Sequence, residues 1–333
     1  MIPMLLSLLA ISLVMTGFVH AAGDDPSTQN ANPEMKVHRN ITIDTNPEAV
    51  LIRTNVVNGS VENHIGILFT TAHGIMIHVA FSHETEVNDV ENEGFLYLRI
   101  AYVSLTEFND TDGNGALDST DKVVQVISLQ NLSYTPPSWK PILSQDNKRG
   151  VEIMSNVTDT KTGLFFGVVA DIFPQYAIVN NVIVPPTATK ITTTINHFPF
   201  KSTTDKLALQ VRAVSATRIE QETPTSEQTI RVRSATAQGF YTWTPTAMVN
   251  GNPSPVVSSF TKAKGVWLIN LAYPSGTSIV HDPLLGFSFG STPIINASML
   301  VGAAISSFAV FGLLVYAGRR QLAGIFSRKP ISM

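Results

Sequence analysis

Apolar residues recur at every second position in several segments of this 333-residue chain. The segments 75–81, 96–102 and 207–213 alternate in this way, and 266–273 (VWLINLAY) is apolar on both faces of an extended strand. Alternation is typical of a strand with one buried face, and a continuous apolar run is typical of a strand buried on both. No amphipathic helix of ten residues is indicated between 37 and 295. The sequence predicts an all-β fold, an antiparallel β-sandwich built as one large or two packed sandwiches.

The N-terminus has the features of a signal peptide. An uncharged apolar run extends from Met4 to Phe18, which is short for a membrane span and suits a signal-peptide core. Val19 and Ala21 provide the small residues expected before a cleavage site. Residues 1–21 are therefore predicted to be a signal peptide, and an uncleaved signal anchor is the alternative.

The remainder before the C-terminal apolar segment divides into two parts. Residues 22–36 are polar without periodicity, so they are predicted to be a flexible lead-in. Residues 37–295 carry the strand pattern and form the predicted ectodomain. Within them, the sequence VPPTATK at 184–190 is a candidate linker, which places a candidate sub-boundary near residues 185–190.

The C-terminus is predicted to anchor the chain in a lipid bilayer. Residues 297–318 contain no charge and are long enough for a transmembrane helix, and 319–333 carry four basic residues and no acidic ones. Basic flanks face the cytoplasm, so the ectodomain is expected outside the cell, on the plasma membrane or another secretory-pathway membrane. Small residues at Ser298, Gly302 and Ser306 could allow a dimer through this helix.

Composition excludes some classes of function. Charged residues make up 14% of the chain and the net charge is −3, so there is no basic footprint for nucleic acid. The chain has no cysteine, so disulfides cannot stabilise the predicted ectodomain. Its stability must come from the size of the core and, we expect, from a metal ion.

The segment FNDTDGNGALDSTD at 108–121 concentrates oxygen-bearing side chains around glycine. Counted from Asp110, a twelve-residue calcium loop has ligand positions 1, 3, 5, 7, 9 and 12. In this chain those positions are Asp110, Asp112, Asn114, Ala116 (through its carbonyl), Asp118 and Asp121. Gly115 occupies the sixth position, where the loop turns sharply. Residues 110–121 thus resemble an EF-hand or dockerin-type calcium loop, with Asp121 in place of the usual Glu.

The flanks of this loop are not those of an EF-hand. The sequences before and after it, GFLYLRIAYVSLTEF and KVVQVISL, are β-rich, so the loop is predicted at the tip of a hairpin. Two strands held in a sheet cannot swing apart as the helices of a calcium sensor do. The predicted Ca²⁺ is therefore structural.

Other motifs indicate surface exposure more than catalysis. The sequence GFSFG at 286–290 matches G-x-S-x-G, but it lacks the strand-turn-helix context of a hydrolase, so no catalytic residue is assigned. The aromatic residues Trp139, Trp243 and Trp267 could line a sugar platform or belong to the core. Six glycosylation sequons lie on the predicted outer side, at Asn40, Asn58, Asn109, Asn131, Asn156 and Asn296.

These features favour a type I, single-pass surface protein. Its expected function is non-enzymatic interaction or adhesion, with an extracellular protein or glycan as partner. The alternatives are a membrane-anchored carbohydrate-active enzyme, which would need paired carboxylates in a cleft, and an accessory subunit of a membrane complex.

Overall fold

The structure is a computed structural model that describes residues 38–289, apart from 59–60, 88–89, 216–218, 223–227, 234–236 and 264–265. The predicted signal peptide, lead-in, transmembrane helix and basic tail, and Asn296, lie outside the described residues. Within the described part of the chain, no helix has the length and apolar character needed to cross a membrane. The fold is all-β with antiparallel sheets, as the alternating pattern predicts, and its one short 3₁₀ helix in this part is η1 (Leu129–Asn131).

The first sheet has nine strands and contains all six strands from β1 to β6, at the N-terminal end of the described chain. Its order begins with consecutive hairpins and ends with strands from later in the sequence. The strands are β1 (His38–Asn46), β2 (Ala49–Asn58), β3 (Val61–Thr70), β4 (Met76–Val87), β5 (Val90–Asn109), β13 (Lys206–Ser215), β20 (Val266–Pro274) and β19 (Val257–Ala263), with β6 (Lys122–Ser128) paired to β5.

The second sheet has eleven strands and centres on β12 (Ala188–Asn196). On one side of β12 lie β9 (Phe165–Ile172), β8 (Arg149–Thr158) and β7 (Ser138–Leu143). The other strands are β14 (Ile219–Glu222), β15 (Gln228–Arg233), β16 (Ala237–Trp243), β22 (Leu284–Phe289), β21 (Ser278–His281), β17 (Thr246–Val249) and β18 (Asn252–Pro255). A separate hairpin joins β10 (Ala177–Val179) to β11 (Val182–Val184).

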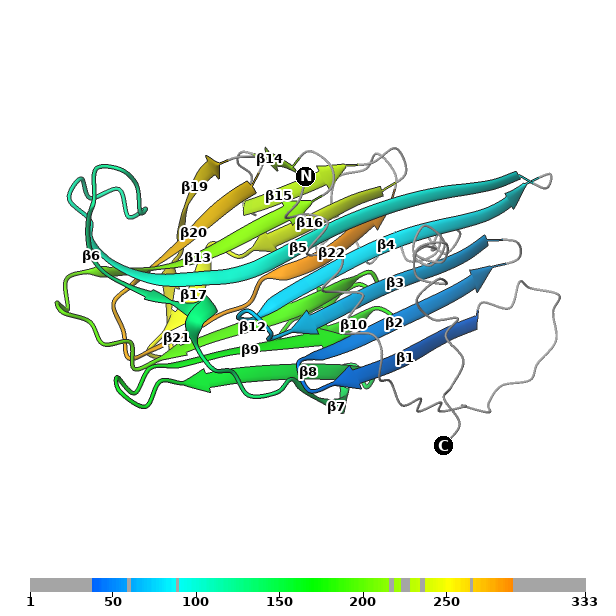
Figure 1. The fold of residues 1–333 in the computed structure, drawn as a ribbon, viewed down its shortest axis with the longest axis horizontal. Helices are drawn as coiled ribbons and strands as arrows, with labels where there is room; N and C mark the ends of the chain where they lie inside the picture. Colours follow the sequence, from blue (N-terminus) through cyan, green and yellow to red (C-terminus); the bar gives the residue numbers. More distant parts are fainter. Residues whose placement is uncertain are drawn as a thin grey trace, which may run out of the picture.

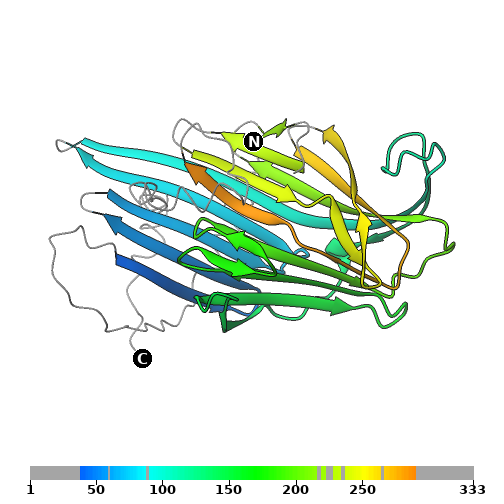
Figure 2. The same cartoon turned by 180° about the vertical axis from the view of Figure 1, so that it is seen from behind.

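The two large sheets form two layers with the main core between them (Figures 1 and 2). The alternating apolar residues of β4, β5 and β13 all point into this core. Contacts between rings join the layers. Phe81 of β4 meets Phe287 of β22 with ring centroids 5.2 Å apart, and Tyr102 of β5 meets Phe166 of β9 edge-on at 5.5 Å. The period-two pattern therefore identified the buried faces correctly.

The segment 185–190 is a turn followed by the first three residues of β12. β9 precedes it and pairs with β12 along eight residue pairs, from Thr189 opposite Ile172 to Asn196 opposite Phe165. The main core also contains residues from both sides of this segment. The candidate sub-boundary thus falls between two neighbouring strands that share a core.

Candidate metal centre

The predicted calcium loop connects β5 to β6 at one end of the molecule (Figure 1). Asn109 and Lys122 face each other as the last pair of the antiparallel ladder, and residues 110–121 follow as the loop. The register shifts between Glu107 and Phe108, so the hairpin has a bulge just before the loop. The prediction of a strand hairpin with this loop at its tip is confirmed.

Part of the loop packs on the outer face of the first sheet, whereas residues 111–114 and 118–120 are exposed. Leu117 packs on this face against a small cluster formed by Phe108, Ala208 and Ala272. The Ser259 hydroxyl of β19 donates a hydrogen bond to the Leu117 carbonyl. This covering explains why the C-terminal half of β20 is buried on both faces, as its continuous apolar sequence predicts.

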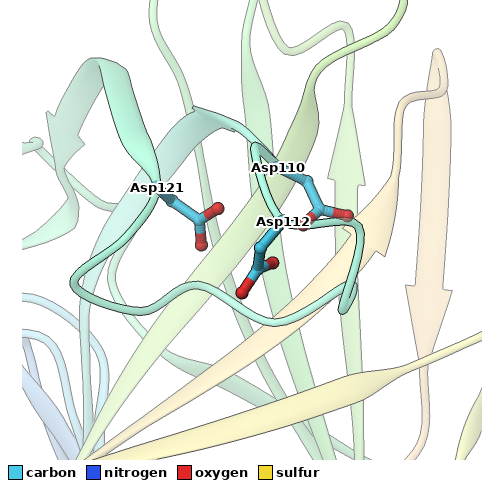
Figure 3. Close-up of side chains that lie close together, drawn as sticks. All are labelled: Asp110, Asp112 and Asp121. Carbon is cyan, nitrogen blue, oxygen red and sulfur yellow. The ribbon is translucent and has the colours of Figure 1, made fainter.

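Three carboxylates of the loop converge (Figure 3). One oxygen from each of Asp110, Asp112 and Asp121 can be chosen so that all three atoms lie within 4.8 Å of one another, and such a group could hold a metal ion. Asp110 lies at the end of β5 and Asp121 at the start of β6, so the sheet fixes the separation of these two. Asp112 approaches them from the loop itself (Figure 3).

The Asp110 side chain is 8% exposed. Its Oδ2 accepts hydrogen bonds from the Gly115 backbone N–H at 3.1 Å and from Lys206 Nζ at 2.6 Å. The hydrogen bond from Lys206, together with the charge of its ammonium group, holds the pKa of the Asp110 carboxyl below its usual value. Its Oδ1 is buried and has no hydrogen-bond partner among the described residues.

Gly115 makes this contact because of its backbone conformation. Its φ is +85°, in the left-handed region that favours glycine. A Cβ on this residue would lie 3.1 Å from Val257 Cγ2 and 3.3 Å from Lys206 Nζ. The sequence places glycine at the sixth loop position for this reason, since the turn leaves no space for a side chain.

Asp121 and Asp112 also organise the loop backbone. Asp121 accepts from the Thr111 N–H through Oδ1 at 3.0 Å and from the Asp118 N–H through Oδ2 at 2.9 Å. Asp112 Oδ1 accepts from the Asn114 N–H at 3.0 Å. The carboxyl groups are therefore held in place by the loop they face.

Asn114 and Asp118 lie beside the three-carboxylate group without being part of it. Asn114 Nδ2 donates to Asp112 Oδ2 and to Asp118 Oδ2, each at 2.8 Å, and its Oδ1 accepts from the Ala116 N–H at 2.6 Å. Hydrogen bonds from the hydroxyl and the N–H of Thr120 lower the pKa of Asp118. Of the six predicted ligands, the structure brings together Asp110, Asp112 and Asp121.

The predicted glycosylation sites differ in their settings. Asn131 is exposed in η1, whereas Asn156 is half-buried within β8. Asn109 uses its side-chain nitrogen, the atom that a glycan would occupy, to donate to Asp205 Oδ1 at 3.1 Å. Asn40 and Asn58 lie in β1 and β2.

Residues 286–289 of the G-x-S-x-G sequence lie in β22, and Ser288 is not arranged as a nucleophile. Ser288 lies opposite Gln238 in the sheet, and its Oγ is buried without a hydrogen-bond partner in the described structure. The nearby His281 uses Nδ1 to contact the Tyr273 hydroxyl and Nε2 to contact the Thr244 carbonyl, each at 3.0 Å. Neither ring nitrogen is directed to Ser288.

The three tryptophans do not share a surface. Trp243 is fully buried, and Trp267 packs against the main core. Trp139 is 42% exposed on β7. The core interpretation therefore holds for Trp243 and Trp267.

A row of charges on the second sheet was not predicted. Lys140, Glu152, Asp171 and Lys190 lie opposite one another on the adjacent strands β7, β8, β9 and β12. The sequence signal is weak, because Lys190 alternates with Ile191 in a pattern that normally indicates a solvent-facing lysine. Recognising the row requires the pairing of strands that are far apart in the sequence.

Comparison of the chain with protein-family models finds no match, and comparison with curated proteins finds none either.

Proposed function

We propose that this protein is a non-enzymatic surface interaction module. In this proposal a β-sandwich is anchored by the predicted helix at 297–318, and loop 110–121 holds a structural Ca²⁺. Support for the sandwich comes from the two layered sheets and the core between them. The main observation in favour of the ion is that Asp110 Oδ1 is buried and has no hydrogen-bond partner in the described structure.

An unpaired carboxylate oxygen in a buried position costs free energy unless a cation or donor compensates it. Asp110 Oδ1 is such an oxygen, and it belongs to the group that also contains Asp112 and Asp121. Lys206 offsets only one of these negative charges. Oxygen-only donor sets suit hard cations. Ca²⁺ accepts a variable number of oxygen ligands in flexible geometry, whereas Mg²⁺ requires a near-octahedral site, so a twelve-residue loop of this kind suits Ca²⁺ better.

Further ligands are available within the loop. Rotation of the Asn114 side chain would exchange its Nδ2 for Oδ1 next to Asp112 and Asp118, and the Ala116 carbonyl supplies the seventh position of the predicted pattern. The ion would tie Asp110 at the end of β5 to Asp121 at the start of β6. Its effect is to stabilise the hairpin end and the loop docked by Leu117.

The interaction surface in this proposal is β6. Among the strands that the structure describes, β6 pairs only with β5, so its other edge is open to a further strand. Its valines are unusually exposed, with Val123 at 50%, Val124 at 36% and Val126 at 57%. Open edges with apolar side chains are sites where an extended segment of a partner protein adds to a sheet. Because the loop ends at Asp121, directly before β6, calcium binding would fix the start of this edge.

The test is cross-linking and co-purification from the native membrane, in calcium and in chelator, with Val126→Lys as the variant. A lysine at this edge should prevent strand addition without disturbing the core, because Val126 is mostly exposed. We expect a partner that the unchanged protein captures in calcium, and that is lost in chelator and in the variant.

Leu143→Lys is the matched control, since Leu143 is 66% exposed on another peripheral strand, β7. This control should retain the partner. Recovery of the same partners with Val126→Lys, or loss of them with Leu143→Lys alone, would contradict the assignment of β6.

A further inference from the structure

The charged row on the second sheet contains a lysine with no access to solvent. Lys190 of β12 has a side chain that is 0% exposed. Its Nζ lies 3.0 Å from Asp282 Oδ1 and donates to Thr192 Oγ1 at 3.0 Å. The Thr192 hydroxyl in turn donates to Asp282 Oδ1 at 2.7 Å. The lysine nitrogen is therefore held directly against one carboxyl group.

The backbone fixes this pair. β21 and β22 pair with successive parts of the same edge of β12, and Asp282 lies in the connection between them. The Ile191 N–H donates to the Pro283 carbonyl at 2.8 Å, which holds the connection against β12. Asp282 is thus kept beside Thr192 and Lys190 by hydrogen bonds on both sides of it.

A second carboxyl group completes the arrangement. Asp171 lies directly opposite Lys190 on β9, is 8% exposed, and has a buried Oδ1 without a partner in the described structure. Burial raises the pKa of Asp171 to about 6, although the nearby charge of Lys190 acts in the opposite direction. A carboxyl group with such a pKa can both release and accept a proton near neutral pH.

We propose that Lys190 and Asp282 condense to form an intramolecular amide bond, and that Asp171 transfers the proton. Proximity is what amide formation between two side chains requires, because it removes the entropic cost of bringing them together. The Lys190 side chain is fully buried and that of Asp282 is 28% exposed, and the product replaces this partly desolvated ion pair with a neutral amide. The proposal is independent of the calcium site.

The step balances without any added reactant. Asp171 accepts a proton from the Lys190 ammonium and passes it to one carboxyl oxygen of Asp282, and the freed amine attacks Cγ. A C–N bond forms, Asp171 carries a second proton from the nitrogen to the same oxygen, and that C–O bond breaks. One oxygen of Asp282 and two hydrogens of the ammonium leave as water, and the two opposite charges disappear together.

Such a bond would connect β12 to the end of the described chain. β22 follows Asp282 and is the last strand before the predicted transmembrane segment. A covalent link at Asp282 would carry tension from a membrane anchor into the middle of the second sheet, in a protein without cysteine.

Peptide mass spectrometry of the full chain tests the proposal. We expect the peptides containing Lys190 and Asp282 to appear as one linked species, about 18 Da lighter than their sum, with no tryptic cleavage after Lys190. A succinimide, which has the same mass loss, cannot form at Asp282 because the following Pro283 has no N–H.

Three variants make the result specific. Lys190→Arg and Asp171→Asn should both lack the linked peptide, whereas Lys140→Arg should retain it, since the Lys140 side chain is 56% exposed and pairs with Glu152. Unlinked peptides from the unchanged chain would overturn the proposal, and this readout does not depend on whether a variant folds. Linked peptides in Asp171→Asn would overturn the role of Asp171.

Discussion

Lys206 Nζ lies 2.6 Å from Asp110 Oδ2, and this ion pair connects β13 to the first residue of the candidate metal loop. The ammonium group compensates one carboxylate but leaves Asp110 Oδ1 without a partner. We therefore expect Lys206 to compensate part of the charge that a bound cation would compensate, and to compete electrostatically with such a cation.

Lys206→Met should separate the stabilising effect of the ion pair from its effect on calcium binding. In chelator, the loss of the ion pair should lower the free energy of unfolding by about 1 kcal/mol, as expected for a partly exposed charged hydrogen bond. In calcium, the variant should bind the ion more tightly, because a positive charge next to the site has been removed. Urea unfolding with and without calcium measures both. Lys201→Met, at an exposed lysine, is the control. A calcium effect that is smaller in Lys206→Met would contradict the proposed competition.

Two glycines of the loop should respond differently to alanine. Gly113 and Gly115 have φ of +75° and +85°, so either substitution strains the backbone by about 1–2 kcal/mol. Around Gly113 nothing lies within 4 Å of an added Cβ, whereas at Gly115 the Cβ would press on Val257. Gly115→Ala should therefore lower the melting temperature more than Gly113→Ala and weaken calcium binding. Equal effects on both measurements would mean that the close packing at Gly115 is not important.

Acidification should destabilise the protein between pH 6 and pH 4. Burial lowers the pKa of His78 to about 3 and that of His281 to about 4, so in this range the unfolded chain binds two protons that the folded chain does not. Burial raises the pKa of Asp171 to about 6, so the folded chain binds one proton that the unfolded chain does not. The difference is one net proton, and stability should fall by about 1.4 kcal/mol per pH unit as pH decreases.

Asp171→Asn tests this pH dependence. This variant removes the one carboxyl whose titration offsets that of the histidines. Only His78 and His281 then contribute, so the free energy of unfolding should fall about twice as steeply with decreasing pH. Urea midpoints measured at pH 6, 5 and 4 give the slope. A shallower slope in Asp171→Asn than in the unchanged protein would contradict the direction assigned to Asp171.

The sequence predicts local features of this fold well, and the reasons are physical. A two-residue period is sufficient to assign the buried face of β4, because each side chain's direction depends only on its neighbours. The calcium-like loop is equally local. Its glycines, carboxylates and flanking strands are contiguous, so the hairpin and the turn at Gly115 could be predicted together.

What could not be predicted depends on long-range pairing. The segment that ends at Lys190 resembles a linker because it contains two prolines, yet it leads directly into the central strand of the second sheet. The approach of Asp282 and Asp171 to Lys190 requires the register of strands on both sides of β12. In the same way, only the structure shows that the Asn114 side chain bridges Asp112 and Asp118.

We propose that Asp110, Asp112 and Asp121 hold a calcium ion that stabilises the protein. The most direct measurement is calorimetric titration of the metal-free protein with calcium, followed by thermal unfolding of the same samples. The claim predicts one ion per chain, with a melting temperature raised by roughly 5–10 °C when calcium is in 100-fold excess over Kd. Asp112→Asn should lose most of both effects. Asp159→Asn, at a hydrogen-bonded carboxylate in the β8–β9 turn, should lose neither. Absence of binding at millimolar calcium, or identical melting curves in calcium and chelator, would contradict the claim.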